Sequence, residues 1–304
     1  MSKIVFWSPL HGQGQTSNLH IISLIMSLLH KRSVLMMQTQ ISMNNLEGPL
    51  VGKTTEILST DTEYVFQDIG LDAAVMYSRM NMLIGDILES CCITFPNTSL
   101  LLLPGTETKN RETFERDVSS AIGKMLLHAE ENVDVVMVDT NSGMDDLSVK
   151  LMSSADLIII NLSQRKYVLN KLFSEYGEVL NKHKNVFYVI GNYDRNSGYN
   201  ISNCRRRHRK YINKDNSGVI PYCTRYMDAQ NDSSILNMVR EGVNSTNMRN
   251  MHKLRMVMKR LFWMHGYSVN ETDNFFYEAN ICVIKILNMI NAANRDDWME
   301  GSGS

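Results

Sequence analysis

Near its N-terminus the sequence reads KIVFW at residues 3–7 and SPLHGQGQTS at residues 8–17. The first run has the composition of a buried strand, and we expect that strand over residues 3–8. The apolar residues that follow the glycines recur at helical spacing, so a helix comes next. A turn between a buried strand and a helix N-terminus suits phosphate, because the first N–H groups of the helix are unpaired. Residues 8–17 therefore predict a phosphate-binding loop.

Each residue type in this loop suits a phosphate in its own way. Gly12 and Gly14 let the backbone approach a phosphate closely, and Thr16 or Ser17 can place a hydroxyl on Mg²⁺. Two glycines in a tight turn are common by themselves, so the prediction depends on their position between strand and helix. The candidate nucleotide-binding residues of the loop are Gly12, Gln13, Gly14, Gln15, Thr16 and Ser17.

Further apolar runs alternate with helical patterns along the chain. We expect strands at residues 34–37, 100–103, 133–138, 156–161, 185–190 and 218–221, and crossover helices at residues 112–130, 145–154 and 165–182. Strands that are uniformly apolar are typical of a parallel sheet that is covered on both faces. The pattern predicts an α/β fold, with a doubly wound, mainly parallel sheet flanked by helices.

The strand pattern stops after about residue 232. Two helical stretches remain, at residues 233–265 and 271–294, and the second is apolar on most sides. Such a helix is usually buried, either against its own core or against a second subunit. We therefore expect an α/β domain over residues 1–232 and a helical C-terminal extension over residues 233–300. Residues 301–304 (GSGS) resemble an added linker.

Composition restricts the class of protein. The 304 residues are 43% hydrophobic and 21% charged, which excludes a disordered chain, and the net charge of −1 indicates no partner. No apolar run approaches the roughly 20 residues that a membrane span needs. The chain reads directly into a strand, which leaves no room for a signal peptide. Its five cysteines include no Cys-x-x-Cys pair. We expect a soluble, cytoplasmic protein.

The order of these segments resembles the deviant Walker A family of ParA, MinD and the pilus-associated TadZ/CpaE proteins. Their loop reads KGGxGKT followed by Thr or Ser, where this chain has LHGQGQTS at residues 10–17. VDVVMVDTNSG at residues 133–143 resembles the family's apolar strand that ends in Asp-Thr-x-x-Gly. VIGNYD at residues 189–194 and IPY at residues 220–222 resemble its later adenine-contacting strand and closing proline loop. The resemblance covers roughly residues 1–240.

This resemblance implies a P-loop NTPase-like fold of the SIMIBI type, with ATP and Mg²⁺ as the expected cofactors. It assigns an adenine contact to Asn192, a further nucleotide-binding role to Pro221, and a role toward Mg²⁺ to Asp139 and Thr16. Alternatively, Asp139 has only a structural role, in which it caps a helix from the end of the strand. Asp145 and Asp146, close by, are expected to begin the next helix.

Four positions depart from the family pattern. Leu10 replaces the signature lysine that reaches across a dimer, and Gln15 replaces the loop lysine. Gln38 and Gln40 stand where the family has Asp-x-Asp. A glutamine offers only a neutral dipole to a phosphate, whereas phosphoryl transfer depends mainly on charge stabilisation. We expect no rapid hydrolysis.

Three functions remain open. The first is a degenerate, dimeric protein that scaffolds or positions a larger machine, such as a pilus or secretion system, with a loop that either binds ATP weakly or stays empty. The second is an active partition ATPase that binds nonspecific DNA. The third is a DNA-binding regulator that uses the fold as a platform.

A basic C-terminal third bears on the choice of partner. Residues 201–260 contain thirteen Lys and Arg against four acidic residues, a local charge of +9. Such a surface suits DNA or an acidic face of a protein partner. The alternative is a solvent-exposed helix face that binds no partner. The densest run is Arg205, Arg206, Arg207, Arg209 and Lys210.

Three further patterns give weaker indications of function. Residues 251–262 form a basic amphipathic helix pattern, which we expect to pack on the domain rather than lie on a membrane. Lys53, in GKTT at residues 52–55, mimics a loop motif but follows no strand. The twenty-one methionines either line an adaptable partner surface or reflect composition alone.

Overall fold

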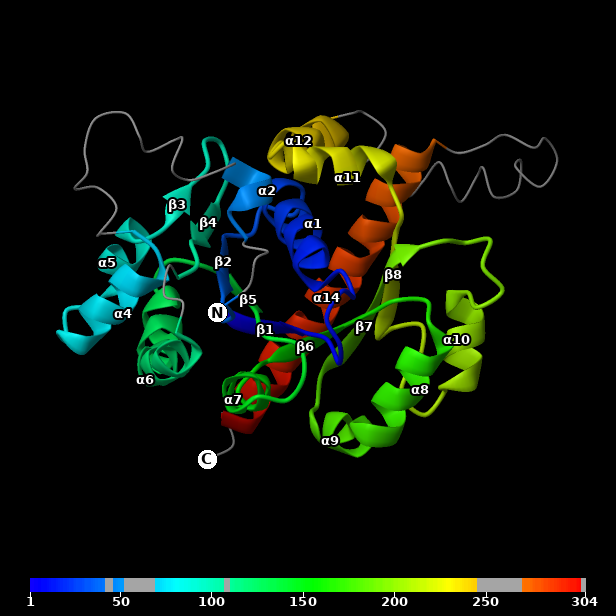
Figure 1. The fold of residues 1–304 in the computed structure, drawn as a ribbon, viewed down its shortest axis with the longest axis horizontal. Coiled ribbons are helices and arrows are strands. Elements are labelled where there is room, and N and C mark those ends of the chain that lie inside the picture. Colours follow the sequence, from blue (N-terminus) through cyan, green and yellow to red (C-terminus); the bar gives the residue numbers. More distant parts are fainter. Residues whose placement is uncertain (42–45, 52–68, 107–109, 245–269, 302–304) are drawn as a thin grey trace.

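The structure, a computed structural model, describes residues 1–41, 46–51, 69–106, 110–244 and 270–301 (Figure 1). Within these residues a single eight-stranded sheet has the order β3-β4-β2-β5-β1-β6-β7-β8. Every neighbouring pair is parallel except β3 with β4. The predicted fold class, a doubly wound and mainly parallel sheet flanked by helices, is confirmed.

The strands lie close to the predicted apolar runs, with one addition. The two-residue strand β3 was not predicted, because Ile93 and Thr94 stand alone without a run to mark them. The strands are β1 (Ser2–Trp7), β2 (Val34–Gln38), β3 (Ile93–Thr94), β4 (Leu100–Leu103), β5 (Val135–Asp139), β6 (Leu157–Leu162), β7 (Val186–Tyr193) and β8 (Ser217–Pro221).

The helices include several that the sequence pattern did not predict. The helix expected over residues 165–182 is wrong as a single helix, because Tyr176 separates α8 from α9. The helices are α1 (Gln15–Leu28), α2 (Gly48–Val51), α4 (Leu71–Arg79), α5 (Gly85–Ser90), α6 (Arg111–Ala129), α7 (Asp146–Ser153), α8 (Lys166–Glu175), α9 (Gly177–Lys182), α10 (Ile201–Arg207), α11 (Thr224–Asn231), α12 (Ile235–Asn244) and α14 (Glu271–Gly301).

Burial on both faces of the sheet explains the uniformly apolar strands. Along β1, Ile4 and Phe6 belong to one apolar cluster, while Val5 and Trp7 belong to the other. Successive side chains of a strand point to opposite faces, so a strand covered on both sides must be apolar at every position. The helices α1, α12 and α14 contribute to the first cluster, and α4, α6 and α8 to the second.

The C-terminal helix α14 packs on its own sheet. Phe275, Phe276, Cys282 and Ile286 are buried in the same cluster as α1 and as Val189 of β7. Cys282 Sγ donates to the carbonyl of Val219 in β8 at 3.4 Å. Figure 1 shows α14 lying beside α1. Of the two predicted uses of this apolar helix, burial against the chain's own core is therefore the observed one.

Close packing between α12 and α14 depends on a glycine. A Cβ at Gly242 would overlap the ring of Phe276, which is almost fully buried. We expect Gly242→Ala to lower the free energy of unfolding by about 1–2 kcal/mol, because overpacking outweighs the gain of about 1 kcal/mol in helix propensity. Denaturant unfolding measures this difference.

A matched control for this substitution lies in α6. A Cβ at Gly123 would meet no atom within 4 Å. Gly123→Ala should therefore raise the free energy of unfolding by up to about 1 kcal/mol. Equal stabilisation by both substitutions would contradict the packing described here.

The described helices include none that is both long enough and apolar enough to cross a membrane. Residues 42–45, 52–68, 107–109, 245–269 and 302–304 lie outside the description. Lys53 and the amphipathic pattern at residues 251–262 are among them, so both stay predictions.

Candidate functional site

The loop between β1 and α1 contains two glycines with positive φ angles. Gly12 and Gly14 have φ angles of 75° and 76°, in the left-handed region that favours glycine. No side chain caps the N-terminus of α1 at Gly14. A Cβ at Gly12 would meet no atom within 4 Å, so this side of the loop is open. The backbone presents the helix N-terminus to an anion.

The side chain of Gln15 points inward instead of toward the open side of the loop. Its amide Nε2 donates to Asp139 Oδ1 at 2.7 Å and to the carbonyl of Thr140 at 2.6 Å. Its Oε1 accepts a hydrogen bond from Ser8 Oγ at 2.6 Å. Both donors and the acceptor of the amide are therefore used within the protein. Gln15 holds the loop to the end of β5.

Asp139, at the end of β5, is fully buried among neutral donors. Thr16 Oγ1 donates to Asp139 Oδ2 at 2.7 Å, and Gln40 Nε2 donates to the same oxygen at 3.1 Å. Burial raises the pKa of Asp139 from 3.8 to about 6, although the hydrogen bonds from Thr16, Gln15 and Gln40 act in the opposite direction. The carboxylate is thus held by dipoles and by no cation.

The end of β2 supplies the remaining amides. Gln38 Oε1 accepts from the backbone N–H of Leu46 at 3.0 Å, and a Cβ at Gly105 would overlap the Gln38 amide. Gln40 reaches Asp139, as described above. The amides of Gln38 and Gln40 therefore both bind other parts of the chain.

Other side chains of the loop also contact the rest of the chain. Gln13 Oε1 accepts from the backbone N–H and the hydroxyl of Ser163, at 3.0 and 2.8 Å. Leu10 is half-buried and packs against the apolar cluster that contains Trp7.

Positive charge is missing from this network. In the described part of the chain, no Lys or Arg forms a hydrogen bond or ion pair with the loop or with Asp139. Nor do the described residues contain a group of three or more His, Cys, Asp or Glu side chains able to hold a metal ion. The two residues predicted to hold Mg²⁺, Asp139 and Thr16, bind each other.

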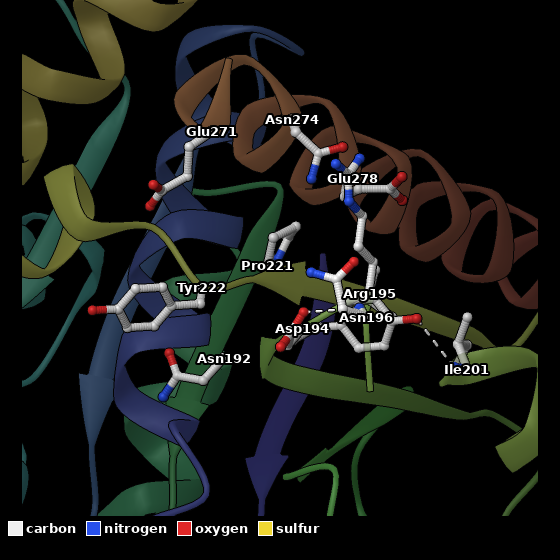
Figure 2. A pocket seen from close by; sticks show the side chains of 12 residues that line it. Asn192, Asp194, Arg195, Asn196, Ile201, Pro221, Tyr222, Glu271, Asn274 and Glu278 are labelled. Atoms are coloured by element: carbon white, nitrogen blue, oxygen red, sulfur yellow. Dashed lines mark hydrogen bonds between the residues drawn. The ribbon is translucent and has the colours of Figure 1, made fainter. Parts of the chain in front are cut away.

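The two residues predicted to bind nucleotide outside the loop lie together, but apart from the loop residues. Asn192, with a φ of 45°, and Pro221 both line an open cavity of about 740 Å³ at the ends of β7 and β8 (Figure 2). Glu271, Asn274 and Glu278 of α14 face the same cavity. None of the loop residues 12–17 is among its lining. The predicted site therefore divides into a loop part and a cavity part.

Ser17, in α1, forms hydrogen bonds with α11 and does not line the cavity. Its hydroxyl donates to Gln230 Oε1 at 3.0 Å, and its carbonyl accepts from the Tyr226 hydroxyl at 2.6 Å. Next to it, Asn18 Nδ2 donates to Asn161 Oδ1 at 3.0 Å, and a Cβ at Gly191 would lie 2.9 Å from that same nitrogen.

Several residues of this network were not singled out from the sequence. Ser8 binds both Gln15 and Ser142, while Ser163 and Asn161 lie at the end of β6. Their only signal is position, because each polar side chain follows or ends an apolar strand. Since the carboxyl ends of parallel strands share one edge of the sheet, these positions could have been grouped with the loop.

The basic run on and after α10 is exposed except for its first arginine. Arg205 is half-buried, and its Nε donates to Ser217 Oγ at 2.8 Å. The pKa of Arg205 is lowered, mainly by burial. Arg206 binds Asn203 of its own helix, and Arg207, Arg209 and Lys210 are exposed. The surface available to an anionic partner therefore excludes Arg205.

The prediction that Asp145 and Asp146 begin the helix after Asp139 is confirmed. Asp145 caps α7, and its carboxylate accepts from the backbone N–H of Ser148 at 3.0 Å. Asp146 is the first residue of the same helix.

Comparison with solved structures identifies the fold. The cell division ATPase MinD of Pyrococcus furiosus superposes with a TM-score of 0.61 at 13% identity, over 94% of this chain and 99% of that chain. A ParA family ATPase from Chlorobium tepidum TLS gives a TM-score of 0.60 at 16% identity, over 78% and 92% of the two chains. A plasmid partition protein from Borrelia burgdorferi B31, bound to AMPPNP, gives 0.57 at 15% identity, over 94% and 98%.

No family model matches the sequence, and no curated protein is significantly similar to it. At these low identities the structural likeness shows the fold alone: the chain has the fold of the MinD and ParA ATPases.

Proposed function

We propose that this protein is a catalytically degenerate relative of the MinD and ParA ATPases that acts as a dimeric scaffold for a larger assembly. The observation that carries the proposal is the hydrogen bonding of Gln15. Its side-chain amide forms hydrogen bonds with Asp139, Thr140 and Ser8. Gln15 stands at the position where the resembled family has the loop lysine. Without a cation the loop cannot neutralise the charge that develops on transferring phosphate.

The loop backbone nevertheless fits a phosphate. The N–H groups of residues 12–16 at the start of α1 would hold the phosphates of ATP, and Asp139 and Thr16 would hold Mg²⁺. Bound Mg²⁺ would supply charge stabilisation to the phosphates. The chain's own residues would supply only backbone and amide dipoles, so we expect any nucleotide to bind weakly and remain intact.

The replacement of the signature lysine by Leu10 also affects dimerisation. Leu10 packs against the core of its own protomer, at the position from which the resembled family extends a lysine to the partner's nucleotide. We therefore expect dimerisation to be independent of ATP. Sedimentation velocity should give the same dimer fraction with and without ATP and Mg²⁺ at equal protein concentration. Monomers that associate only when ATP is added would contradict a fixed scaffold.

A second candidate function, nonspecific DNA binding, is favoured by the exposed basic side chains at and after α10. Arg206, Arg207, Arg209 and Lys210 are all exposed and could contact phosphates without reading sequence. Duplex DNA binding that weakens steeply with salt, and that Arg206→Glu/Arg207→Glu abolishes, would favour this function. Arg205→Gln is not a suitable probe, because Arg205 holds Ser217.

A further inference from the structure

A groove between α4 and α6 combines exposed methionines with an apolar floor. It has a volume of about 440 Å³, and its floor includes the buried side chains of Phe114 and Val118. Met76 on α4 and Met80, the residue directly after α4, line it four residues apart, with exposed fractions of 38% and 59%. Beyond the end of α4, Met82 and Ile84 are also about half exposed. Large apolar side chains that cluster on a surface in this way mark contact sites more often than scattered ones do.

The charge around the groove is negative. Residues 71–132, which include α4, α5 and α6, contain nine acidic and five basic residues, a net charge of −4. The cations nearest the groove are already engaged. Arg79 pairs with Asp117, and Lys124 Nζ donates to Asn81 Oδ1 at 2.7 Å.

Carboxylates of this region remain exposed to solvent. Asp86 and Glu89 on α5, and Glu112 and Glu130 at the two ends of α6, are exposed. In the described residues no ion pair is formed by any of these four carboxylates. The groove is therefore apolar at its base and belongs to a segment whose net charge is negative.

We propose that this groove binds a basic amphipathic helix of a partner protein. A helix lays its apolar face into such a groove, with anchors at i, i+3, i+4 and i+7. The unbranched methionine side chains adapt to the shape of those anchors. Lys and Arg on the flanks of the incoming helix meet the free carboxylates, which supplies charge complementarity and steering. The groove uses no residue of the loop, so this interaction stands apart from nucleotide binding.

The test uses a fluorescein-labelled Leu/Lys peptide of about 18 residues, five helical turns, with leucines along one face. Fluorescence anisotropy measures its binding to the full chain. The expected result is saturable binding that weakens several-fold between about 50 and 300 mM salt. A Leu/Glu peptide with the same leucine pattern should not bind.

Matched variants locate the interaction. Met76→Ser/Met80→Ser removes the exposed anchors and should weaken peptide binding about tenfold or more. Val149→Ser/Val179→Ser removes two exposed apolar side chains from α7 and α9 and should change it less than about twofold. Because all four side chains are at the surface, circular dichroism should show that both variants fold.

Three outcomes would overturn the proposal. The first is equal binding of the Leu/Lys peptide to the Met76→Ser/Met80→Ser variant and the unmodified protein. The second is equal binding of the Leu/Glu peptide. The third is self-association of the chain that the Met76→Ser/Met80→Ser variant abolishes while peptide binding persists, which would assign the groove to a second copy of this chain.

Discussion

Replacing Gln15 by lysine should increase the affinity for ATP by about ten- to hundredfold. The new ammonium group would lie in the loop beside Asp139. It would add a full positive charge to a loop whose described residues offer a phosphate only backbone and side-chain dipoles. Hydrogen bonds that involve a charged group contribute roughly 1.5–3 kcal/mol, and 1.4 kcal/mol corresponds to a factor of ten. Isothermal titration of the protein with ATP and Mg²⁺ measures the change.

Two variants serve as controls for the Gln15→Lys substitution. Gln13→Lys adds the same charge two residues away, where the present side chain is directed to Ser163. We expect it to raise the affinity far less, because its side chain starts from the other side of the loop. Gln15→Met preserves the length of the side chain without charge and should not raise the affinity. Equal gains from Gln13→Lys and Gln15→Lys would mean that position 15 has no special relation to the phosphate.

The Asp139→Asn substitution should stabilise the protein at neutral and alkaline pH. Burial raises the pKa of Asp139 to about 6, so the folded state prefers the protonated form. Since one pKa unit corresponds to about 1.4 kcal/mol, the ionised carboxylate lowers the free energy of unfolding by roughly 3 kcal/mol. An asparagine removes this cost, and the hydroxyl of Thr16 and the amide of Gln40 can rotate to accept from its NH₂ group.

The pH dependence of this effect has a definite sign. Below about pH 3 the carboxyl group is neutral in both states, so the substitution should change stability little. As the pH rises from about 4 to 6 the unfolded chain releases the proton first, and the stability of the unmodified protein falls relative to the variant. Above about pH 6 the difference should stay constant at up to about 3 kcal/mol.

Urea unfolding at several pH values, without nucleotide or metal, measures the Asp139→Asn effect. Asp232→Asn, at an exposed position after α11, is the control and should give no such difference. A variant at Asp139 that is less stable than the unmodified protein at pH 8, with an unchanged pH profile, would show that the network needs the charge.

Much of the fold could be predicted from residues that are close in sequence. The apolar runs located seven of the eight strands, because a strand buried on both faces has no polar position to interrupt it. The short helices α4, α5 and α10 were missed, because six to nine residues give too few turns for a helical repeat to stand out. The break at Tyr176 is followed by Gly177, but the apolar residues on either side of it continue the helical repeat, so a single helix was expected.

The candidate site was predicted less completely, because its contacts join distant residues. The sequence shows that Gln15 lacks a charge, but the direction of its side chain is set by Asp139 and Thr140, more than 120 residues away. Similarly, Arg205 belongs to a basic run in sequence, yet Ser217 across the turn draws its guanidinium inward. Residue type alone shows that positions 15, 38 and 40 are neutral amides, whereas the contacts made across the sheet determine where Gln15 and Gln40 bind.

The most direct test of the account is steady-state release of phosphate from ATP by the purified protein with Mg²⁺. Because no Lys or Arg of the described residues binds the loop or Asp139, we expect a rate indistinguishable from that of a Thr16→Ala variant, at every ATP concentration up to saturation. Removal of one charge-stabilising group typically lowers turnover by about 10²–10³-fold, and here several are replaced. Steady turnover that Thr16→Ala abolishes would contradict the account, because some other cation would then have to reach the terminal phosphate.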